Sequence, residues 1–205
     1  MNKKEKFFGV NNTNWGHKWG FRDSGFIVNE DRSVTFAGNR YPICGKKLSK
    51  FIPFVEEVLG IEFKIKPKVE ELDKKHVDKA FVNHDFISEL RSKFDEDRFT
   101  EEENERLLHS HGQHSTDEVY KVLYGKLKKF TDLVFYIESE EEAIELIELA
   151  KKHDVCLIPY GGGTNVTNAL RPPEDEHRMI VTVDTRRLNK IESLDKENLM
   201  VTVQS

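Results

Sequence analysis

Three consecutive glycines, Gly161, Gly162 and Gly163, constrain the fold of this chain more than any other feature. They follow the short apolar segment of residues 155–158, which is typical of a buried strand. Glycines at the end of a strand let the backbone take positive φ angles and leave a stretch of surface without side chains. Successive amide N–H groups can then line one concave face, which attracts anions. Residues 159–167 are therefore predicted to form a phosphate-binding loop.

The residues before this loop predict a strand–helix–strand unit. Leu133–Tyr136 is a short apolar strand, and Ser139 with Glu142 forms a capping box that starts a helix. Apolar residues then recur on one helical face, at Ala143, Leu146, Ile147 and Ala150. The short connections predict two parallel strands, at residues 133–136 and 155–158, that pair beneath the helix. Ligands of open α/β sheets gather at the carboxyl ends of such strands, where the glycines lie.

Two common phosphate loops do not match these residues. A P-loop requires a lysine after its last glycine, and this chain has Thr164 and Asn165 there. A dinucleotide-binding fold requires a long helix after the glycines, which Pro172 and Pro173 prevent. Thr164 and Thr167 add hydroxyl donors to the predicted loop. The spacing alone also allows a sharp turn without a ligand, so this alternative stays open.

Composition and charge narrow the classes of function. The chain has 205 residues, of which 37% are hydrophobic and 34% charged, enough for one domain with a substantial core or for two small ones. A net charge of −5, with scattered lysines and arginines, predicts no nucleic-acid partner. No apolar run is long enough to span a bilayer, and no apolar stretch typical of a secretory signal follows the basic amino terminus.

The cysteines and histidines predict no metal site. Cys44 and Cys156 have no partner at metal-ligand spacing, and both are expected to be buried thiols in a reducing compartment. His109, His111 and His114 lie near a helix end, but their spacing does not place three imidazoles on one face. We expect these histidines to be structural or to line an approach to the loop.

A change of character near residue 100 predicts two domains, a helix-rich extension at 1–100 and an α/β domain at 101–205. In the extension, Gly38 and Asn39 predict a hairpin turn between strands at 33–37 and 40–43. Helices are predicted at 51–59, capped by Gly60, and around 86–94. The charge-rich stretches 73–79 and 95–105 are expected to be solvated.

The second region continues with short elements. Thr100 and Glu103 predict a capping box and a helix to Leu108, and a further helix is predicted to end at Gly125. After the loop, a strand is predicted at 179–183 and a pair of strands between 191 and 205. The last of these strands is expected to leave an open edge.

At this point the sequence resembles the first FAD-binding subdomain of the vanillyl-alcohol-oxidase type flavoproteins, whose FAD-binding domain is also called PCMH-type. The segments that carry this resemblance are residues 132–136, 156–170, 178–184 and 188–191. Within that superfamily the chain is most similar to the alkylglycerone-phosphate synthase family, through residues 15–24, 38–42, 51–60 and 106–112. Gln113, Ile137 and Asn165 depart from the residues usual in the family, but none breaks a loop that binds through its backbone.

The resemblance implies an α+β fold, with a helical amino-terminal extension before the first α/β subdomain of a PCMH-type FAD-binding domain. It also implies FAD as the cofactor, held without a covalent link, because Gly163 stands where relatives that tether FAD carry a histidine. The residues that would hold the FAD pyrophosphate are Pro159, Tyr160, Gly161, Gly162, Gly163, Thr164, Asn165, Val166 and Thr167. The catalytic groups of the family are expected beyond residue 205, so none is assigned in this chain.

The implied reaction exchanges the acyl chain of acyl-dihydroxyacetone phosphate for a long-chain fatty alcohol in ether-lipid synthesis. A homodimer, a peripheral membrane contact and a peroxisomal location are implied with it, although no targeting signal is visible in the chain. Two alternatives stay open: an FAD-linked 2-hydroxy-acid dehydrogenase or oxidase with the same loop, and a truncated product without catalysis.

Overall fold

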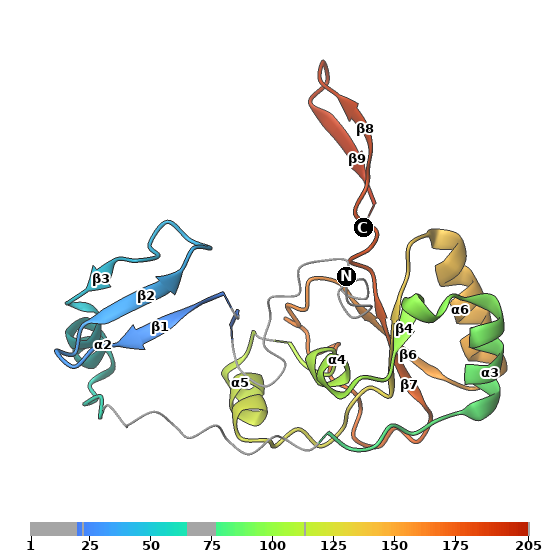
Figure 1. Ribbon diagram of the computed structural model, residues 1–205, viewed down its shortest axis with the longest axis horizontal. Helices are drawn as coiled ribbons and strands as arrows, with labels where there is room; N and C mark the ends of the chain where they lie inside the picture. The colour runs from blue at the N-terminus through green and yellow to red at the C-terminus, as the bar shows by residue number, and fades with distance from the viewer. Residues whose placement is uncertain (1–19, 22, 65–76, 113, 205) are drawn as a thin grey trace. The chain divides into compact units, whose positions relative to one another are not determined.

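The chain folds as two compact units, which lie within Thr13–Lys75 and His76–Ser205. The structure, a computed structural model, describes residues 20–21, 23–64, 77–112 and 114–204 (Figure 1). The first unit ends at Lys75. Residues 77–100, which the sequence analysis placed in the extension, therefore belong to the second unit. Mixed helices and strands confirm the expected α+β class. Most of the motif at residues 15–24, and the charged stretch before residue 77, fall outside the described residues.

In its described residues, the first unit combines a small antiparallel sheet with one helix. Its strands are β1 (Ser24–Val28), β2 (Val34–Gly38) and β3 (Lys47–Leu48), in the order β1-β2-β3. The helix α2 (Phe51–Leu59) ends at Gly60, whose left-handed φ of 65° confirms the predicted cap. The rings of Phe26 and Phe51 stack with their centroids 5.9 Å apart.

The predicted hairpin turn at Gly38 and Asn39 is wrong. β2 pairs with β1 across a turn at residues 29–33, where the amide of Asn29 donates to the carbonyl of Ser33 over 2.9 Å. Gly38 has a φ of 105° because its backbone lies directly against the carbonyl of Asp23 and the Cα of Ser24, which leaves no room for a side chain. The glycine therefore serves a close approach of two strands rather than a turn.

The second unit is built on a four-stranded sheet. Its strands are β4 (Phe99–Thr100), β5 (Leu133–Tyr136), β6 (Cys156–Tyr160) and β7 (Ile180–Asp184), in the order β4-β5-β7-β6. β5, β7 and β6 are parallel, and β4 is an antiparallel edge strand. The predicted strands β5 and β6 are parallel, but the prediction that they pair directly is wrong, because β7 lies between them and bonds to both.

Helices cover both faces of this sheet (Figure 1). They are α3 (His84–Lys93), α4 (Glu103–Leu108), α5 (Thr116–Leu123) and α6 (Glu140–Lys152), with a short 3₁₀ turn at Glu96–Arg98. Ser139 caps α6 by accepting a hydrogen bond from the amide of Glu142, as predicted. The capping box predicted at Thr100 is wrong, because Thr100 belongs to β4 and α4 begins without a side-chain cap.

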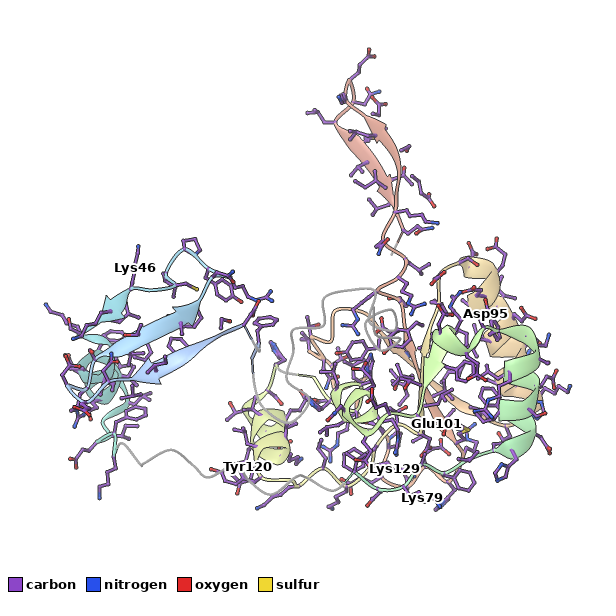
Figure 2. The ribbon with its side chains drawn as sticks, viewed as in Figure 1. Lys46, Lys79, Asp95, Glu101, Tyr120 and Lys129 are labelled. Carbon is purple, nitrogen blue, oxygen red and sulfur yellow. The ribbon has the colours of Figure 1, made fainter. Side chains whose placement is uncertain are left out.

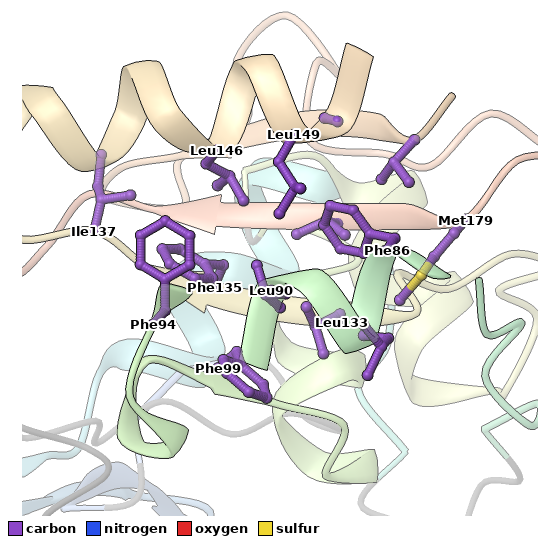
Figure 3. Packing of buried hydrophobic residues seen from close by; sticks show 14 residues of the cluster. Phe86, Leu90, Phe94, Phe99, Leu133, Phe135, Ile137, Leu146, Leu149 and Met179 are labelled. Carbon is purple, nitrogen blue, oxygen red and sulfur yellow. The ribbon is translucent and has the colours of Figure 1, made fainter. Parts of the chain in front are cut away.

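The main core lies between the sheet and the pair α3 and α6 (Figure 3). Figure 3 shows Phe86 and Leu90 from α3 facing Leu146 and Leu149 from α6, with Phe135 of β5 beneath. Alternate strand residues face this core, and the residues between them face α4. The side of the sheet that faces α4 is more polar and carries the candidate site.

Two expectations about polar residues are corrected. In the stretch 95–105, Asp95 and Glu101 are exposed (Figure 2), but Arg98 and Glu105 are buried. Arg98 donates to the carbonyl of Tyr136 at 3.0 and 3.1 Å and contacts Glu142, so partners far along the chain compensate its burial. The two cysteines are free thiols, as expected, but both are half-buried rather than buried.

The predicted pair of strands near the end of the sequence forms the hairpin β8 (Ile191–Asp195) and β9 (Met200–Val203). Its apolar side chains are exposed, and Leu199 at the turn is 90% exposed. Among the described residues, no helix has both the length and the apolar character needed to cross a membrane.

Candidate functional site

The carboxyl ends of the three parallel strands meet at one edge of the sheet, where the glycine loop begins. The last residues of these strands, Tyr136, Asp184 and Tyr160, are paired in register and all are buried. After Tyr160 the chain leaves β6 through Gly161, Gly162 and Gly163. The loop therefore lies at the edge where ligands of open α/β sheets bind.

The backbone of this loop has the properties of an anion-binding cradle. None of the amide N–H groups of residues 161–167 donates a hydrogen bond to another residue that the structure describes. Gly163 and Asn165 have positive φ angles of 69° and 52°, and alternation of this kind turns neighbouring amides toward one side. A Cβ added to Gly161 or Gly162 would meet nothing closer than 3.9 Å, so space in front of the backbone is open. The loop thus fits a bound pyrophosphate.

The side chain of Tyr160 packs against the loop at Gly163. A Cβ added to Gly163 would collide with the Tyr160 hydroxyl and would lie 2.9 Å from the ring carbon Cζ. The Tyr160 ring packs in turn on His109, with centroids 4.4 Å apart. Burial raises the pKa of the Tyr160 hydroxyl to about 12, so it stays a protonated phenol at neutral pH.

His109, at the end of α4, connects this helix to the edge of the sheet. Its Nε2 lies 2.9 Å from Asp184 Oδ2, and its Nδ1 lies 2.8 Å from the carbonyl oxygen of Glu105. Tyr136 donates its hydroxyl proton to the Glu105 carboxylate over 2.7 Å. Burial raises the pKa of Tyr136, and the Glu105 carboxylate raises it further, so this phenol also stays protonated. Contacts at both ring nitrogens fix the orientation of His109, and the Tyr160 ring that contacts the loop packs against it.

Arg186 places a cation at the end of β7. Its Nε donates to Asp184 Oδ2 over 2.8 Å, and its guanidinium carbon lies 5.3 Å from the centre of the Tyr160 ring. Burial alone would raise the pKa of Asp184, but hydrogen bonds from His109 and Arg186 outweigh this effect and lower it. Asp184 is therefore a carboxylate at neutral pH, and its charge holds Arg186 beside the strand that leads into the loop.

The connection between α4 and α5 holds the other end of the loop. Asn165 is buried, and its side-chain amide donates to Glu118 Oε1 from α5. The same carboxylate oxygen accepts from the amide of Gly112 over 2.9 Å. A Cβ added to Gly112 would collide with the Asn165 side chain and lie 3.0 Å from the carbonyl oxygen of Gly163. Gly112 is thus required by the close approach of two loops.

The structure distributes the predicted site residues over two environments. Tyr160 and Asn165 are buried and face the protein, so their side chains shape the loop. The others are exposed or half-buried along the loop and the end of β6: Pro159, Gly161, Gly162, Gly163, Thr164, Val166 and Thr167. The expectation that His109 is structural agrees with its place beside the loop, whereas the sequence did not identify the other supporting residues, Gly112, Glu118, Asp184 and Arg186. Their types carried no local signal except Gly112, an isolated glycine after a helix.

The three histidines considered as metal ligands differ in burial. His109 and His111 are buried, whereas His114 is exposed. His111 Nδ1 lies 2.7 Å from the carbonyl oxygen of Gly112, and both ring nitrogens of His109 face protein oxygens. Within the described ranges, no group of three histidine, cysteine or acidic side chains could hold a metal ion.

Comparison with known proteins agrees with this geometry. Residues 131–205 match the family described as FAD binding domain, so FAD, the cofactor expected from the sequence, is confirmed for the family of this segment. An alkyldihydroxyacetonephosphate synthase of Caenorhabditis elegans is 37% identical over 91% of this chain and 31% of its own length. A mitochondrial D-lactate dehydrogenase (cytochrome) of Arabidopsis thaliana is less similar, with 26% identity over 60% of this chain and 19% of its own length.

The fold points to the same relatives. A solved structure of an alkyldihydroxyacetonephosphate synthase superimposes with a TM-score of 0.79 at 25% identity, over 94% of this chain and 36% of the solved chain. The chain thus spans about a third of the length of the synthases that it matches. In sequence and in fold, this chain is therefore homologous to the alkyldihydroxyacetonephosphate synthases, also called alkylglycerone-phosphate synthases, and residues 131–205 match an FAD binding domain.

Proposed function

We propose that the loop from Pro159 to Thr167 holds the pyrophosphate of FAD without a covalent link. We propose further that residues 101–205 are part of a PCMH-type FAD-binding domain and that residues 1–100 are an amino-terminal extension to it. The observation that carries the proposal is the run of amides at 161–167, which donate to no described residue and lie at the carboxyl edge of a parallel sheet, with open space in front of Gly161 and Gly162. A pyrophosphate supplies the acceptors that such a run of donors needs.

The proposed activity is that of an alkyldihydroxyacetonephosphate synthase, in which a long-chain fatty alcohol replaces the acyl chain of acyl-dihydroxyacetone phosphate. Bound FAD would supply an electrophilic ring for this exchange. The residues of this chain bind and orient: the loop amides receive the pyrophosphate, and Tyr160 and His109 keep the loop from collapsing onto the sheet. No residue of this chain is assigned a proton transfer.

An FAD-linked 2-hydroxy-acid dehydrogenase is the alternative, since a D-lactate dehydrogenase matches part of the chain. The synthase is favoured because the Caenorhabditis elegans synthase is 37% identical over 91% of this chain, whereas the Arabidopsis thaliana dehydrogenase is 26% identical over 60% of it. A homodimer, a peripheral membrane contact and a peroxisomal location complete the proposal by the same resemblance. Light scattering of the purified protein tests the dimer, and cell fractionation tests the location.

Titration with FAD tests the site. The chain should quench flavin fluorescence on binding, and Gly162→Asp should abolish the quenching, because a carboxylate in front of the amides would occupy the space and repel the pyrophosphate. Gly25→Asp is the matched control, since Gly25 also has open space around it but lies in the first unit. Equal affinity of the chain and of Gly162→Asp would rule out the proposed loop.

Acid precipitation tests the non-covalent link. Flavin bound through backbone hydrogen bonds alone should pass into the supernatant when the protein is denatured. Flavin that stays in the pellet would show a covalent bond and would contradict the proposal. Because the catalytic groups are expected beyond residue 205, this chain alone should be inactive in both reactions. Exchange of labelled fatty alcohol into acyl-dihydroxyacetone phosphate, compared with oxidation of D-lactate, therefore distinguishes the synthase from the alternative in a longer protein that contains these residues.

A further inference from the structure

Glu118 is a buried carboxylate that the proposed binding of FAD does not use directly. It lies in the first turn of α5 and is 3% exposed. Oε1 accepts two hydrogen bonds, from the amide of Gly112 and from the side chain of Asn165. Oε2 is also buried but has no hydrogen-bond partner among the described residues. Burial of a carboxyl group costs free energy unless hydrogen bonds compensate it. The two bonds to Oε1 supply this compensation, and both join Glu118 to the loops around it.

Asn165 receives the contact from Glu118 within the glycine loop itself. Its φ of 52° lies in the left-handed region, which asparagine tolerates better than most residues because its short polar side chain can form local hydrogen bonds. Both ends of its side chain are bonded: the amide nitrogen donates to Glu118, and Oδ1 accepts from the amide of Leu170 over 2.9 Å. The side chain of Asn165 therefore fixes the backbone angle that turns the neighbouring amides of the loop.

The position of Glu118 is itself determined by its helix. Ser115 caps α5 and accepts a hydrogen bond from the amide of Glu118 over 3.2 Å. On the other side, Gly112 lies so close to Asn165 that neither loop can shift toward the other. Glu118 thus connects the amino-terminal end of α5 to a residue 47 positions further along the chain.

We propose that Glu118 is a positioning residue: through Asn165 it holds the loop 161–167 in the shape that receives the pyrophosphate of FAD. This inference rests on the proposed function, and it adds that the cradle is formed before FAD binds. A preformed cradle lowers the entropy that FAD binding must overcome, whereas a loose one must be ordered at that moment. Glu118 does not touch the cofactor in this proposal and acts only through Asn165.

Substitution of Glu118 tests the proposal by FAD titration of the full chain. Glu118→Ala should weaken FAD binding about tenfold or more, the loss expected when charge-assisted hydrogen bonds that order a loop are removed. Glu118→Gln keeps a carbonyl oxygen for Gly112 and Asn165, and its amide group occupies the unpartnered position, so affinity should be largely retained. Asp117→Ala is the control, because Asp117 lies on the same helix but is exposed.

A second variant tests the contact from the other side. Asn165→Asp replaces the donor that faces Glu118 by a carboxylate, and two like charges in contact should weaken FAD binding strongly. The double variant Asn165→Asp with Glu118→Gln removes this repulsion and should recover part of the affinity. Additive effects of the two substitutions, with no recovery, would show that the pair is not coupled and would overturn the proposal.

Amide exchange in the flavin-free chain separates this proposal from the proposed function. The amide of Leu170 donates to Asn165, so Glu118→Ala should speed its hydrogen exchange about tenfold or more if the contact holds the loop. The amide of Ile180, in the inner strand β7, donates to the side chain of Asp132; its exchange reports global opening and should be unchanged. Unchanged exchange at Leu170 would overturn the role of Glu118, whether or not FAD binds. Faster exchange at Leu170, in a chain that shows no FAD binding, would contradict the proposed function and, with it, the role of the loop toward FAD.

Discussion

At the scale of single residues, Gly162 and Gly163 are neighbours with opposite surroundings. Gly162 has open space at the position of a Cβ and an ordinary φ, whereas Gly163 has a φ of 69° and lies directly on the Tyr160 ring. The Tyr160 side chain is buried against His109 and cannot move aside easily. The same methyl group should therefore have very different effects at these two positions.

We expect Gly163→Ala to lower the free energy of unfolding by roughly 1–3 kcal/mol, from left-handed strain together with the collision with Tyr160. Gly162→Ala should change it by less than about 0.5 kcal/mol, as for substitutions that meet no neighbour. Urea unfolding followed by circular dichroism measures both values. Equal stability of the two variants would mean that Tyr160 does not support the loop as described.

At the scale of elements, α5 and α6 begin with the same cap but have different relations to the loop. Ser115 and Ser139 each accept a hydrogen bond from the amide three residues ahead, over 3.2 Å in both helices. α5 carries Glu118, which contacts the loop, whereas α6 packs on the main core. Substitution of the two serines can therefore distinguish an effect on the stability of a helix from an effect on the position of the loop.

Ser115→Ala and Ser139→Ala should each lower the free energy of unfolding by about 1 kcal/mol, the usual effect of losing an amino-terminal cap. Only Ser115→Ala should also weaken FAD binding, because it loosens the turn that positions Glu118. Chemical unfolding and FAD titration of both variants give the two readouts. Equal losses of FAD affinity in both variants would contradict a special connection between α5 and the loop.

At the scale of the whole molecule, one buried network joins α4 to the centre of the sheet in the second unit. Asp184 is its central carboxylate, bonded to His109 and Arg186 and fully buried. Because these bonds lower the pKa of Asp184 in the folded chain, its ionised form stabilises the fold above the unfolded pKa near 3.8. This stabilisation is lost as the pH falls through the lower pKa of the folded state.

Asp184→Asn should therefore lower the free energy of unfolding by roughly 1.5–3 kcal/mol at neutral pH, the range for hydrogen bonds to charged groups. The difference from the unsubstituted chain should shrink as the pH falls below about 4, where the unfolded carboxyl becomes protonated. Unfolding curves between acid and neutral pH measure this change, with the exposed Asp175→Asn as control. A difference that stays constant down to acid pH would exclude Asp184 as an ionised member of the network.

Features encoded within a few neighbouring residues could be predicted from the sequence. The cap at Ser139, the helix that follows it, the left-handed end at Gly60 and the strand that leads into the glycines all depend on short-range hydrogen bonds and periodicity. The glycine loop belongs to the same class, because three consecutive glycines after an apolar run mark a loop at the end of a strand. Its role in binding FAD stays a prediction that the experiments above address.

Features that depend on distant segments were decided only by the tertiary structure. Gly38 was predicted to form a turn, but its backbone lies against the carbonyl of Asp23, just before the neighbouring strand β1. β7 lies between β5 and β6, an order that no local pattern specifies.

The side chains that hold the loop in place also depend on distant segments. Glu118 and Asp184 contact partners 47 and 75 positions away, so neither could be recognised before the chain was folded. The sequence by itself thus indicated the loop, the helix and the strands next to it, because the bonds of the helix close within a few residues and the strands show as short apolar runs. The ladder bonds of those strands, to β7, depend on tertiary structure. The residues that hold the loop in place were decided by tertiary structure, because only packing brings such distant side chains within hydrogen-bond distance.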